Sequence, residues 1–281
     1  MSTIQTMKRF KKTGFLIIAR LKSTRLPNKI LKKICGKSFI DHMIIKLKSA
    51  DFIDNVIVCT SNLTKDQKLE KISKKNNINC FRGDPDDVIK RMYEASIKHN
   101  LKYILCITAD CPLVDIPYAK KILKKLKNEN FDLVRAFSLP HGAFCYGIRP
   151  KALKTICDIK NTKYTANWEK YFTRIKKFKV ADLKIPKKHI CRELRITLDY
   201  YEDFFLIRKI YKSLYKEKKL FNLEDILKLV RQNPKLTSIN SFRSSDYIKN
   251  YKSETKLKLK NKFNHLKIRK PIYKEFANFI K

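Results

Sequence analysis

Glycine and proline are scarce in this sequence, which has 5 Gly and 9 Pro among 281 residues. A glycine-rich loop that cradles phosphate needs glycine at defined positions, and one segment imitates such a loop. Gly36-Lys37-Ser38 has the form of the end of a Walker A loop, but that motif requires a glycine five residues earlier, where Leu31 stands. Lys32 and Lys33 also occupy positions where so tight a loop favours small residues. The sequence therefore argues against a P-loop.

Paired cysteine ligands are missing as well. None of the eight cysteines forms a Cys-x-x-Cys pair, and no histidine falls at zinc-site spacing. Cys59, Cys80 and Cys106 fall in predicted strands, where a free cysteine packs as a small hydrophobic residue. These features predict a reduced, intracellular protein without a structural metal of the cysteine type.

Long hydrophobic runs are absent too. The apolar run Phe15–Ile18 is interrupted at Arg20, which makes it too short for a signal peptide or a membrane-spanning helix. With no other candidate span, we expect a cytoplasmic protein without membrane insertion. No histidine stands near a recognisable nucleophile elbow, which argues against a hydrolase.

Acidic residues are few: 26 Asp and Glu stand against 65 Lys and Arg, and the formal net charge is +39. The excess is mostly lysine, with 51 Lys and 14 Arg, and it is spread along the chain. Such uniform enrichment favours a compositional bias over a binding adaptation. We therefore expect weak attraction to polyanions and no specific nucleic-acid partner.

Short apolar runs alternate with amphipathic stretches through the first half of the chain. Strands are predicted at Phe15–Ala19, Val56–Thr60, Asn79–Arg82 and Tyr103–Thr108. Helices are predicted between them: at Ser38–Lys48, from a capping box at Thr64–Gln67 to Asn76, and after an N-cap and first-turn proline in Asp84–Asp87. This order predicts an α/β fold whose parallel sheet is covered by helices on both faces.

The pattern is less regular in the second half. The predicted elements are helices at 117–127, 149–156, 164–172, 200–214 and 223–230, and strands at 131–136, 144–148 and 192–198. Residues 1–240 are expected to form the main domain. Residues 241–281 are polar and strongly basic, and we expect a tail that is helical or partly disordered.

A basic loop follows the first predicted strand. Ala19–Lys29 carries two Arg, two Lys, a Ser and a Thr just beyond a strand end, where ligands bind in open α/β sheets. Guanidinium groups grip phosphate with two hydrogen bonds, and lysine adds point charge, so the loop suits a triphosphate. The alternative is a solvated basic turn.

Two carboxylates follow other predicted strands. Asp110 and Asp199 each lie just past a strand end, at the same sheet edge as the basic loop. Two carboxylates beside a phosphate-binding loop suggest Mg²⁺ with a nucleoside triphosphate, because magnesium completes its octahedron with water and phosphate oxygens. The alternative is that each aspartate merely caps the helix that follows it.

Several motifs spaced along the chain resemble those of one protein family. Ala19–Lys29 reads Ala-Arg-x-x-Ser-Thr-Arg-Leu-Pro-x-Lys and resembles the signature of sugar cytidylyltransferases, a group that includes ketodeoxyoctonate and acylneuraminate cytidylyltransferases. The spore-coat polysaccharide biosynthesis branch is the most similar. The resemblance runs from about Gly14 to Leu214 and continues through Cys59–Ser61, Phe81–Asp84, Asp87-Val88, Ile107–Asp115, Ala152-Leu153, Leu194–Asp199 and Glu202-Asp203.

That resemblance implies a nucleotide-diphospho-sugar transferase fold, a Rossmann-like three-layer sandwich with a mixed, mostly parallel sheet. It implies transfer of CMP from CTP to a sugar, with release of pyrophosphate, for surface polysaccharide biosynthesis. The nucleotide-binding residues it implies are Arg20, Ser23, Arg25, Lys29 and Arg82, with Arg20, Lys29 and Asp110 catalytic. Asp110 and Asp199 would hold Mg²⁺.

The chain departs from the family pattern at several positions. Lys22 and Asn28 stand where the family usually has glycine, and Ala109 precedes the first metal aspartate. The sugar-facing segment 140–147 lacks the expected acidic residues, which leaves His141 and Tyr146 as candidate substrate contacts. The sugar itself is therefore open.

Two other functions remain open from the sequence. One is a glycosyltransferase on the same fold that uses a nucleotide-sugar donor. The other is a non-catalytic polyanion-binding protein on a degenerate transferase scaffold. Because family members often pair, a homodimer is a further expectation from the resemblance.

Overall fold

The first strand, β1 (Thr13–Ile18), is buried along its whole length at the middle of a sheet. The computed structural model describes residues 13–217, 219–253 and 257–269. Over these residues, seven strands form one sheet in the order β5-β4-β1-β6-β8-β7-β9. β4 (Asn55–Ser61) and β6 (Tyr103–Thr108) flank β1 in parallel, and β5 (Asn79–Gly83) extends the sheet in parallel beyond β4. The four strands predicted for the first half are confirmed.

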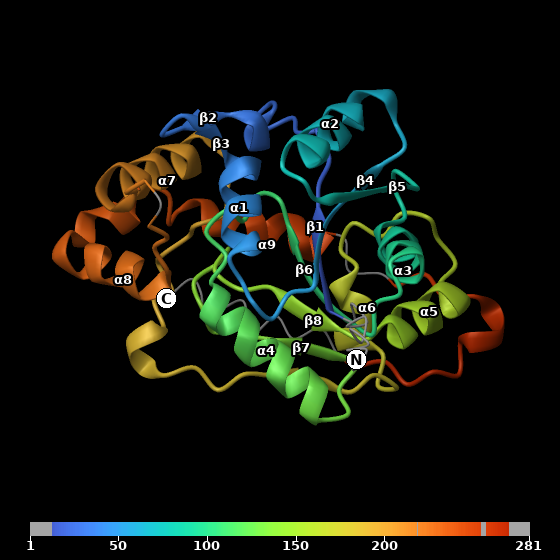
Figure 1. The fold of residues 1–281 in the computed structure, drawn as a ribbon. Coiled ribbons are helices and arrows are strands. Elements are labelled where there is room, and N and C mark those ends of the chain that lie inside the picture. The colour runs from blue at the N-terminus through green and yellow to red at the C-terminus, as the bar shows by residue number, and fades with distance from the viewer. Residues whose placement is uncertain (1–12, 218, 254–256, 270–281) are drawn as a thin grey trace, which may run out of the picture.

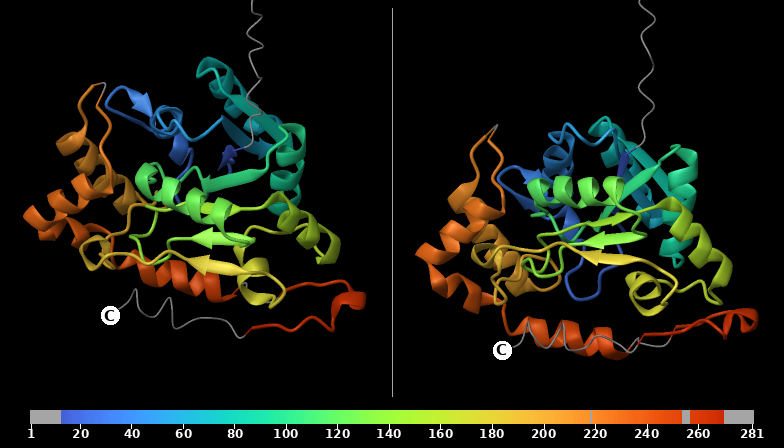
Figure 2. Two further views of the ribbon diagram at one scale, coloured as in Figure 1. Left: turned by 60° about the horizontal axis from the view of Figure 1, so that its bottom comes forward. Right: turned by 90° about the horizontal axis from the view of Figure 1, so that it is seen from below.

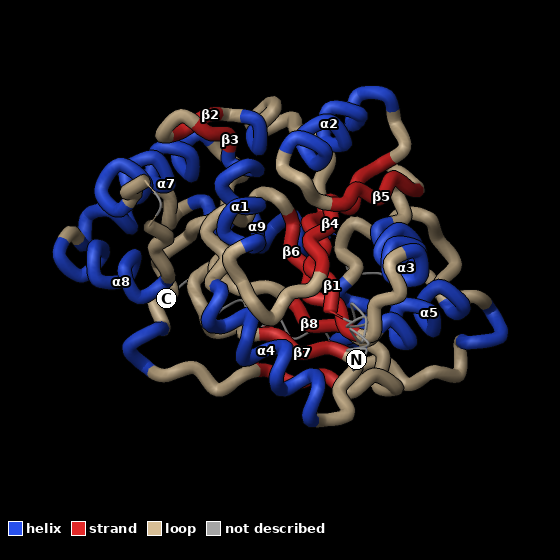
Figure 3. Tube along the Cα trace, viewed as in Figure 1, coloured by secondary structure: helices blue, strands red, loops and turns tan. Residues whose placement is uncertain are grey.

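Side chains from the two faces of β1 enter two separate cores. Phe15 and Ile17 pack into one core, while Leu16 and Ile18 pack into the other. The first core takes in α1 (Phe39–Lys48) and α4 (Ile116–Asn128), and the second takes in α3 (Val88–Lys98) and α5 (Pro150–Ile159). Helices therefore cover both faces of the sheet, as Figures 1 and 3 show, and the predicted three-layer arrangement is confirmed.

The sheet becomes mixed in its second half. β8 (Tyr146–Ile148) runs antiparallel to both β6 and β7 (Leu133–Arg135), and β9 (Val180–Asp182) runs parallel to β7. The remaining helices are α2 (Gln67–Lys75), α6 (Glu169–Arg174), α7 (Tyr201–Leu214), α8 (Leu223–Gln232) and α9 (Arg243–Ser253). A short hairpin of β2 (Lys33–Ile34) and β3 (Lys37–Ser38) lies apart from the main sheet.

That hairpin contains the segment that imitates a P-loop. Gly36 has φ of 80° and Cys35 has φ of 47°, so the two residues form a turn with left-handed backbone. Ser38 ends the hairpin and caps α1, since its hydroxyl accepts a hydrogen bond of 3.2 Å from the Asp41 N–H. The argument against a P-loop is confirmed.

The predicted strand at 192–198 is wrong. Its one bridge joins Arg195 to His141, and its backbone bonds go to loops: Ile196 N–H to the His141 carbonyl at 2.8 Å and Leu198 N–H to the Asp110 carbonyl at 2.7 Å. The alternation of apolar residues misled the prediction, because the polar residues between them are buried too. The predicted helix at 164–172 is also shifted, since α6 covers only Glu169–Arg174.

Two predicted helix starts are wrong as well. No side-chain cap precedes α2; instead the Asp66 carboxylate accepts the Leu21 N–H at 2.7 Å. In the segment Asp84–Asp87, the N-cap of α3 is Asp87, whose carboxylate accepts the Lys90 N–H. Asp84 instead closes a turn before α3. Asp66 thus bonds outside its own segment, whereas Asp84 accepts the N–H groups two and three residues later, as an N-cap does, but the helix begins only at Val88.

The C-terminal segment returns to the main body. Lys160 bridges to Leu259 and Ile175 to Ile268, so residues 257–269 lie against α5 and the end of α6. Figure 2 shows α9 and this segment along one side of the molecule, beyond β9. The rest of the predicted tail, residues 254–256 and 270–281, lies outside the described residues, and the division at residue 240 stays a prediction. Among the helices that the structure describes, none is long and apolar enough to cross a membrane.

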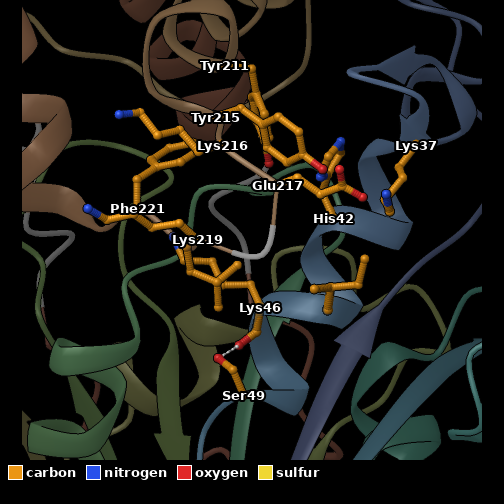
Figure 4. A pocket seen from close by; sticks show the side chains of 12 residues that line it. Lys37, His42, Lys46, Ser49, Tyr211, Tyr215, Lys216, Glu217, Lys219 and Phe221 are labelled. Atoms are coloured by element: carbon orange, nitrogen blue, oxygen red, sulfur yellow. Dashed lines mark hydrogen bonds between the residues drawn. The ribbon is translucent and has the colours of Figure 1, made fainter.

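One lysine of α1 is enclosed in the protein. Lys46 is 6% exposed, and its Nζ has no hydrogen-bond partner among the described residues. Its ammonium lies 5.5 Å from the centre of the Phe221 ring, at the wall of a cavity of about 390 Å³ that Figure 4 shows between α1 and the loop after α7. Burial lowers the pKa of Lys46 to about 8, although the negative charges of Asp115 and Asp225 act to raise it.

Replacing Lys46 should stabilise the fold. Between about pH 8 and 10.5 the unfolded chain binds a proton that the folded chain does not, so the unfolding free energy rises with pH across this window. Lys46→Met removes the whole cost of burying the charged ammonium group at pH 7, and we expect the free energy of unfolding to rise by about 3 kcal/mol. Urea unfolding at pH 7 and pH 10 measures it, with the exposed Lys48→Met as the control. A Lys46→Met protein no more stable than wild type at pH 7 would contradict this account.

Candidate functional site

Three loops meet at the carboxyl end of β1 and β6. The first follows β1, the second follows β6, and the third is the segment that leads into α7. The Ala109 N–H bonds to the Ile18 carbonyl at 2.9 Å, and the Asp110 carbonyl accepts bonds from the Leu198 N–H and from the Thr197 hydroxyl at 3.2 Å. These backbone contacts bring Asp110 and Asp199 to one place, as the sequence predicted.

Lys29 lies between the two aspartates. Its Nζ is 2.8 Å from Asp110 Oδ2 and 2.8 Å from Asp199 Oδ1. Arg25 adds a second cation, 3.2 Å from Asp199 Oδ1. The structure therefore brings together four of the predicted site residues, Arg25, Lys29, Asp110 and Asp199. We call these four residues the charged cluster.

The backbone of the basic loop suits this arrangement. Asn28 directly precedes Lys29 and has φ of 52°, a left-handed conformation that asparagine tolerates. Lys22, the other position where the family usually has glycine, is not among the residues with positive φ. Neither departure prevents the loop from delivering Lys29 to the carboxylates.

The charges in the cluster support one another. Burial works against the charge on Lys29, but the carboxylates of Asp110 and Asp199 overcome it and raise the pKa of Lys29 above its usual value. Burial likewise opposes the charge on Asp199, and the cations of Lys29 and Arg195 hold its pKa well below its usual range. Both groups are therefore charged at neutral pH.

A buried network fixes Asp199 from behind. The Arg195 guanidinium is 2.9 Å from Asp199 Oδ2 and 3.0 Å from Asp203 Oδ1. Asp203 Oδ2 accepts the Asp199 and Tyr200 N–H groups at 2.8 and 3.0 Å, and Asn240 Nδ2 donates to Asp203 Oδ1 at 2.8 Å. Asp199 is thus left with Oδ1 directed at Lys29.

Sequence reasoning gave no role to Arg195, Asp203 or Asn240. An arginine inside an apolar alternation is a signal that could have found Arg195, since a buried guanidinium needs acidic partners. Asn240 is fully buried and carries no such signal, because it lies 37 residues from Asp203.

Two predicted arginines lie outside the charged cluster. Arg20 bonds to the Pro85 carbonyl and lies 3.2 Å from Asp86, which ties the basic loop to the turn before α3. Arg82 donates to the carbonyls of Ser61, Asn62 and Leu63 at 3.1 to 3.3 Å and pairs with Glu70 at 3.2 Å. Ser23 accepts the Leu26 N–H at 3.4 Å within the basic loop.

The two candidate substrate contacts have different surroundings. His141 Nδ1 is 3.2 Å from Arg195, and burial together with that cation lowers the pKa of His141 to about 4, so the ring is neutral at pH 7. The Tyr146 ring packs edge-on against Trp168 and Phe144, with centroids 4.9 and 5.4 Å apart. His141 therefore contacts the network behind Asp199, and Tyr146 belongs to an aromatic cluster.

The residues fit a hard cation only in part. No group of three or more His, Cys, Asp or Glu in the described part of the chain could hold a metal ion. Asp110 and Asp199 are two carboxylates that already share one cation, the Lys29 ammonium. Two carboxylates suffice for Mg²⁺, which keeps several waters and takes its other ligands from phosphate.

Comparisons with known proteins identify a family and several relatives of this chain. A family model described as cytidylyltransferase matches residues 15–262. An uncharacterised protein of Methanocaldococcus jannaschii is 30% identical over 233 residues, which cover 80% of this chain and 93% of that protein. The spore coat polysaccharide biosynthesis protein SpsF of Bacillus subtilis is 24% identical over 227 residues, which cover 78% of this chain and 94% of SpsF.

Solved structures share the fold. A cytidylyltransferase from Leptospira borgpetersenii superimposes with a TM-score of 0.72 at 27% identity, over 80% of this chain and 96% of that chain. A CMP:2-keto-3-deoxy-manno-octonic acid synthetase, in a complex with CTP, has a TM-score of 0.56 at 13% identity, over 73% of this chain and 100% of that chain. The predicted nucleotidyltransferase fold is confirmed.

Removing the central cation should destabilise the protein. Lys29→Met leaves Asp110 and Asp199 without their shared partner, and we expect a loss of about 3 kcal/mol at pH 7. Because the Lys29 pKa is raised and the Asp199 pKa is lowered on folding, the loss is greatest between about pH 4 and pH 10. It shrinks as pH falls through the folded pKa of Asp199.

Denaturant unfolding of wild type and Lys29→Met across that pH range measures the difference. Lys29→Arg, which keeps a cation in reach of both carboxylates, is the control and should lose less. Equal stability of wild type and Lys29→Met at neutral pH would show that the ammonium does not hold the cluster together.

Proposed function

The chain belongs to the cytidylyltransferase family, and from this premise we propose that it transfers CMP from CTP to a hydroxyl group of a sugar or sugar acid, releasing pyrophosphate. The observation that carries the proposal is the position of Lys29, 2.8 Å from both Asp110 and Asp199 at the carboxyl edge of the sheet. We further propose that the reaction serves surface polysaccharide biosynthesis in the cytoplasm and that the protein is a homodimer. The similarity to SpsF supports the pathway.

Asp110 and Asp199 would hold Mg²⁺, which when bound neutralises phosphate oxygens and orients the triphosphate. Lys29 and Arg25 are the cations of the charged cluster, and they would present positive charge to the phosphates once the carboxylates have another partner. Such residues act by positioning and by stabilising charge on the leaving group, which is what phosphoryl chemistry mostly requires of a protein.

The two remaining nucleotide residues would act less directly. Arg20 lies in the basic loop with its side chain 28% exposed, and its bond to Pro85 would place the turn before α3 beside the nucleotide. Arg82 holds the loop after β4 through three carbonyls, so its role would be to shape that loop. Ser23 would supply a hydroxyl to a phosphate, and His141 and Tyr146 stay candidate sugar contacts.

Nucleotide selectivity is the decisive test of this function. Thermal unfolding of the purified protein is followed with Mg²⁺ and CTP, UTP, ATP or GTP in turn, because a ligand that binds only the folded state raises the melting temperature. A rise selective for CTP that is lost in Asp199→Ala supports the proposal. Equal rises with all four nucleotides that moderate salt removes would favour the polyanion-binding alternative instead.

Asp110→Asn should abolish turnover while leaving the fold intact. The amide keeps the volume of the carboxylate but removes its charge, so we expect CMP transfer to fall by at least about 100-fold in the presence of Mg²⁺. Pyrophosphate release from CTP with a panel of sugars and sugar acids measures it. Asp51→Asn, a carboxylate that is 84% exposed, is the matched control and should retain wild-type activity. Normal turnover in Asp110→Asn would remove the proposed role of Asp110.

Arg25→Ala should weaken triphosphate binding. The variant loses a guanidinium that would make charge-assisted hydrogen bonds to phosphate, and we expect the Kd for CTP with Mg²⁺ to rise about tenfold. Isothermal titration of CTP and of CMP separates the contributions, since CMP lacks the β- and γ-phosphates. An equal loss of affinity for both ligands would argue that Arg25 does not contact the outer phosphates.

A further inference from the structure

Three arginines from distant parts of the chain approach the ring of Tyr200, and the guanidinium carbon of Arg195 is the farthest of the three, 5.8 Å from the ring centre. The guanidinium carbon of Arg25, in the basic loop, is 5.0 Å from the ring centre, and that of Arg243, at the start of α9, is 4.5 Å from it. Arg25 also donates to the Tyr200 hydroxyl at 3.3 Å. Tyr200 directly follows Asp199, so these contacts lie beside the charged cluster.

Arg243 is held in place on its other side. Its guanidinium is 2.8 and 3.3 Å from the two oxygens of Glu202, in the first turn of α7, and 3.0 Å from Asp246 on α9. A guanidinium paired at both ends keeps a fixed plane, which suits it to support an aromatic ring. Arg25, with a side chain 44% exposed, is bonded in this structure to Asp199 and to the Tyr200 hydroxyl.

Asn240 makes a second link from the same segment. Its amide donates to the Arg195 carbonyl and to Asp203 Oδ1, both at 2.8 Å, and it is fully buried. Asp203 and Arg195 in turn fix the backbone and Oδ2 of Asp199. Residues 240–243 therefore support two members of the charged cluster: Arg25 through Tyr200, and Asp199 through Asp203.

We propose that Arg243 and Asn240, where the C-terminal segment begins, are positioning residues of the nucleotide site: Arg243 orients Arg25 through the Tyr200 ring, and Asn240 fixes Asp199 through Asp203. The inference rests on the proposed function, because the group that Arg25 is oriented toward is the triphosphate of CTP. It gives the basic C-terminal segment a part in catalysis beyond its covering of α5 and α6.

A positioning role differs from a purely structural one in its kinetic signature. Loss of Arg243 leaves the reacting groups in place but removes the contact that orients Arg25. Binding of the triphosphate therefore weakens, while the rate of the chemical step stays the same. We expect Arg243→Gln to raise the KM for CTP about three- to tenfold with kcat within about twofold of wild type. Arg243→Lys keeps a cation over the ring and should recover most of the loss.

Arg231 offers a matched control. It is an exposed arginine on α8 that pairs with Glu224 at 3.1 Å and donates to the Lys188 carbonyl, so Arg231→Gln removes the same charge and a similar surface ion pair elsewhere on the protein. Its KM for CTP should stay within about twofold of wild type, whatever the salt concentration. An equal rise in Arg243→Gln and Arg231→Gln would mean that net charge alone is responsible, and would overturn the inference.

A double-mutant cycle tests the path through Tyr200. If Arg243 acts by orienting Arg25, then Arg243→Gln should change the Kd for CTP little once Arg25 is already alanine. Additive losses in the double variant would overturn the inference. Glu202→Gln, which loosens Arg243 without removing it, should give a smaller rise in KM and replaces Arg243→Gln if that variant does not fold.

The test separates this inference from the proposed function. Tight, Mg²⁺-dependent CTP binding by wild type together with an unchanged Arg243→Gln would overturn the positioning role alone. Absence of CTP binding in wild type would overturn both, because Arg25 would then have no triphosphate to meet. For Asn240, an Asn240→Ala protein that folds should lose affinity for Mg²⁺ with CTP, and full affinity would remove Asn240 from the proposal.

Discussion

Two carboxylates share one ammonium group at the carboxyl edge of the sheet, and the polar structure around them depends on that contact. Asp110 and Asp199 would repel each other at this separation if Lys29 did not lie between them. Because Lys29 comes from the loop after β1, this contact ties that loop to the loop after β6 and to the segment before α7. It also concentrates opposite charges at one point of a chain whose formal net charge is +39.

Burying so many charges is possible because each has a partner. Asp203 and Arg195 are almost fully buried, and their mutual contacts with Asp199 and Asn240 replace the water that they lose. The same network leaves Asp199 Oδ1 directed at Lys29 and Arg25. Lys46 is the contrast within this protein: it is buried without a hydrogen-bond partner in the described structure, and its pKa falls accordingly.

Much of the first half could be read from the sequence because its signals are local. The buried strands are short β-branched runs, and the segment order between them is that of a parallel sheet. The segment 192–198 misled the prediction because an alternation of apolar residues usually marks a half-buried strand, whereas here Arg195 and Thr197 on the other face are buried as well. Asp66 misled it because its carboxylate accepts the Leu21 N–H from another loop, and Asp84 misled it because it closes a turn before α3 begins.

The sequence by itself determined the strand and helix order of the first half and the basic loop after β1, since each depends on residues that are neighbours in the chain. It also predicted Asp110 and Asp199 at one sheet edge, although the strand that it placed before Asp199 does not form. Only the tertiary structure decided which cations meet those aspartates. Lys29 lies 81 residues from Asp110 and 170 from Asp199, while Arg82, equally basic, is turned onto carbonyl groups of the loop after β4. The physical reason is that a long charged side chain takes the partners within its reach, and packing of distant segments, not local sequence, sets which partners those are.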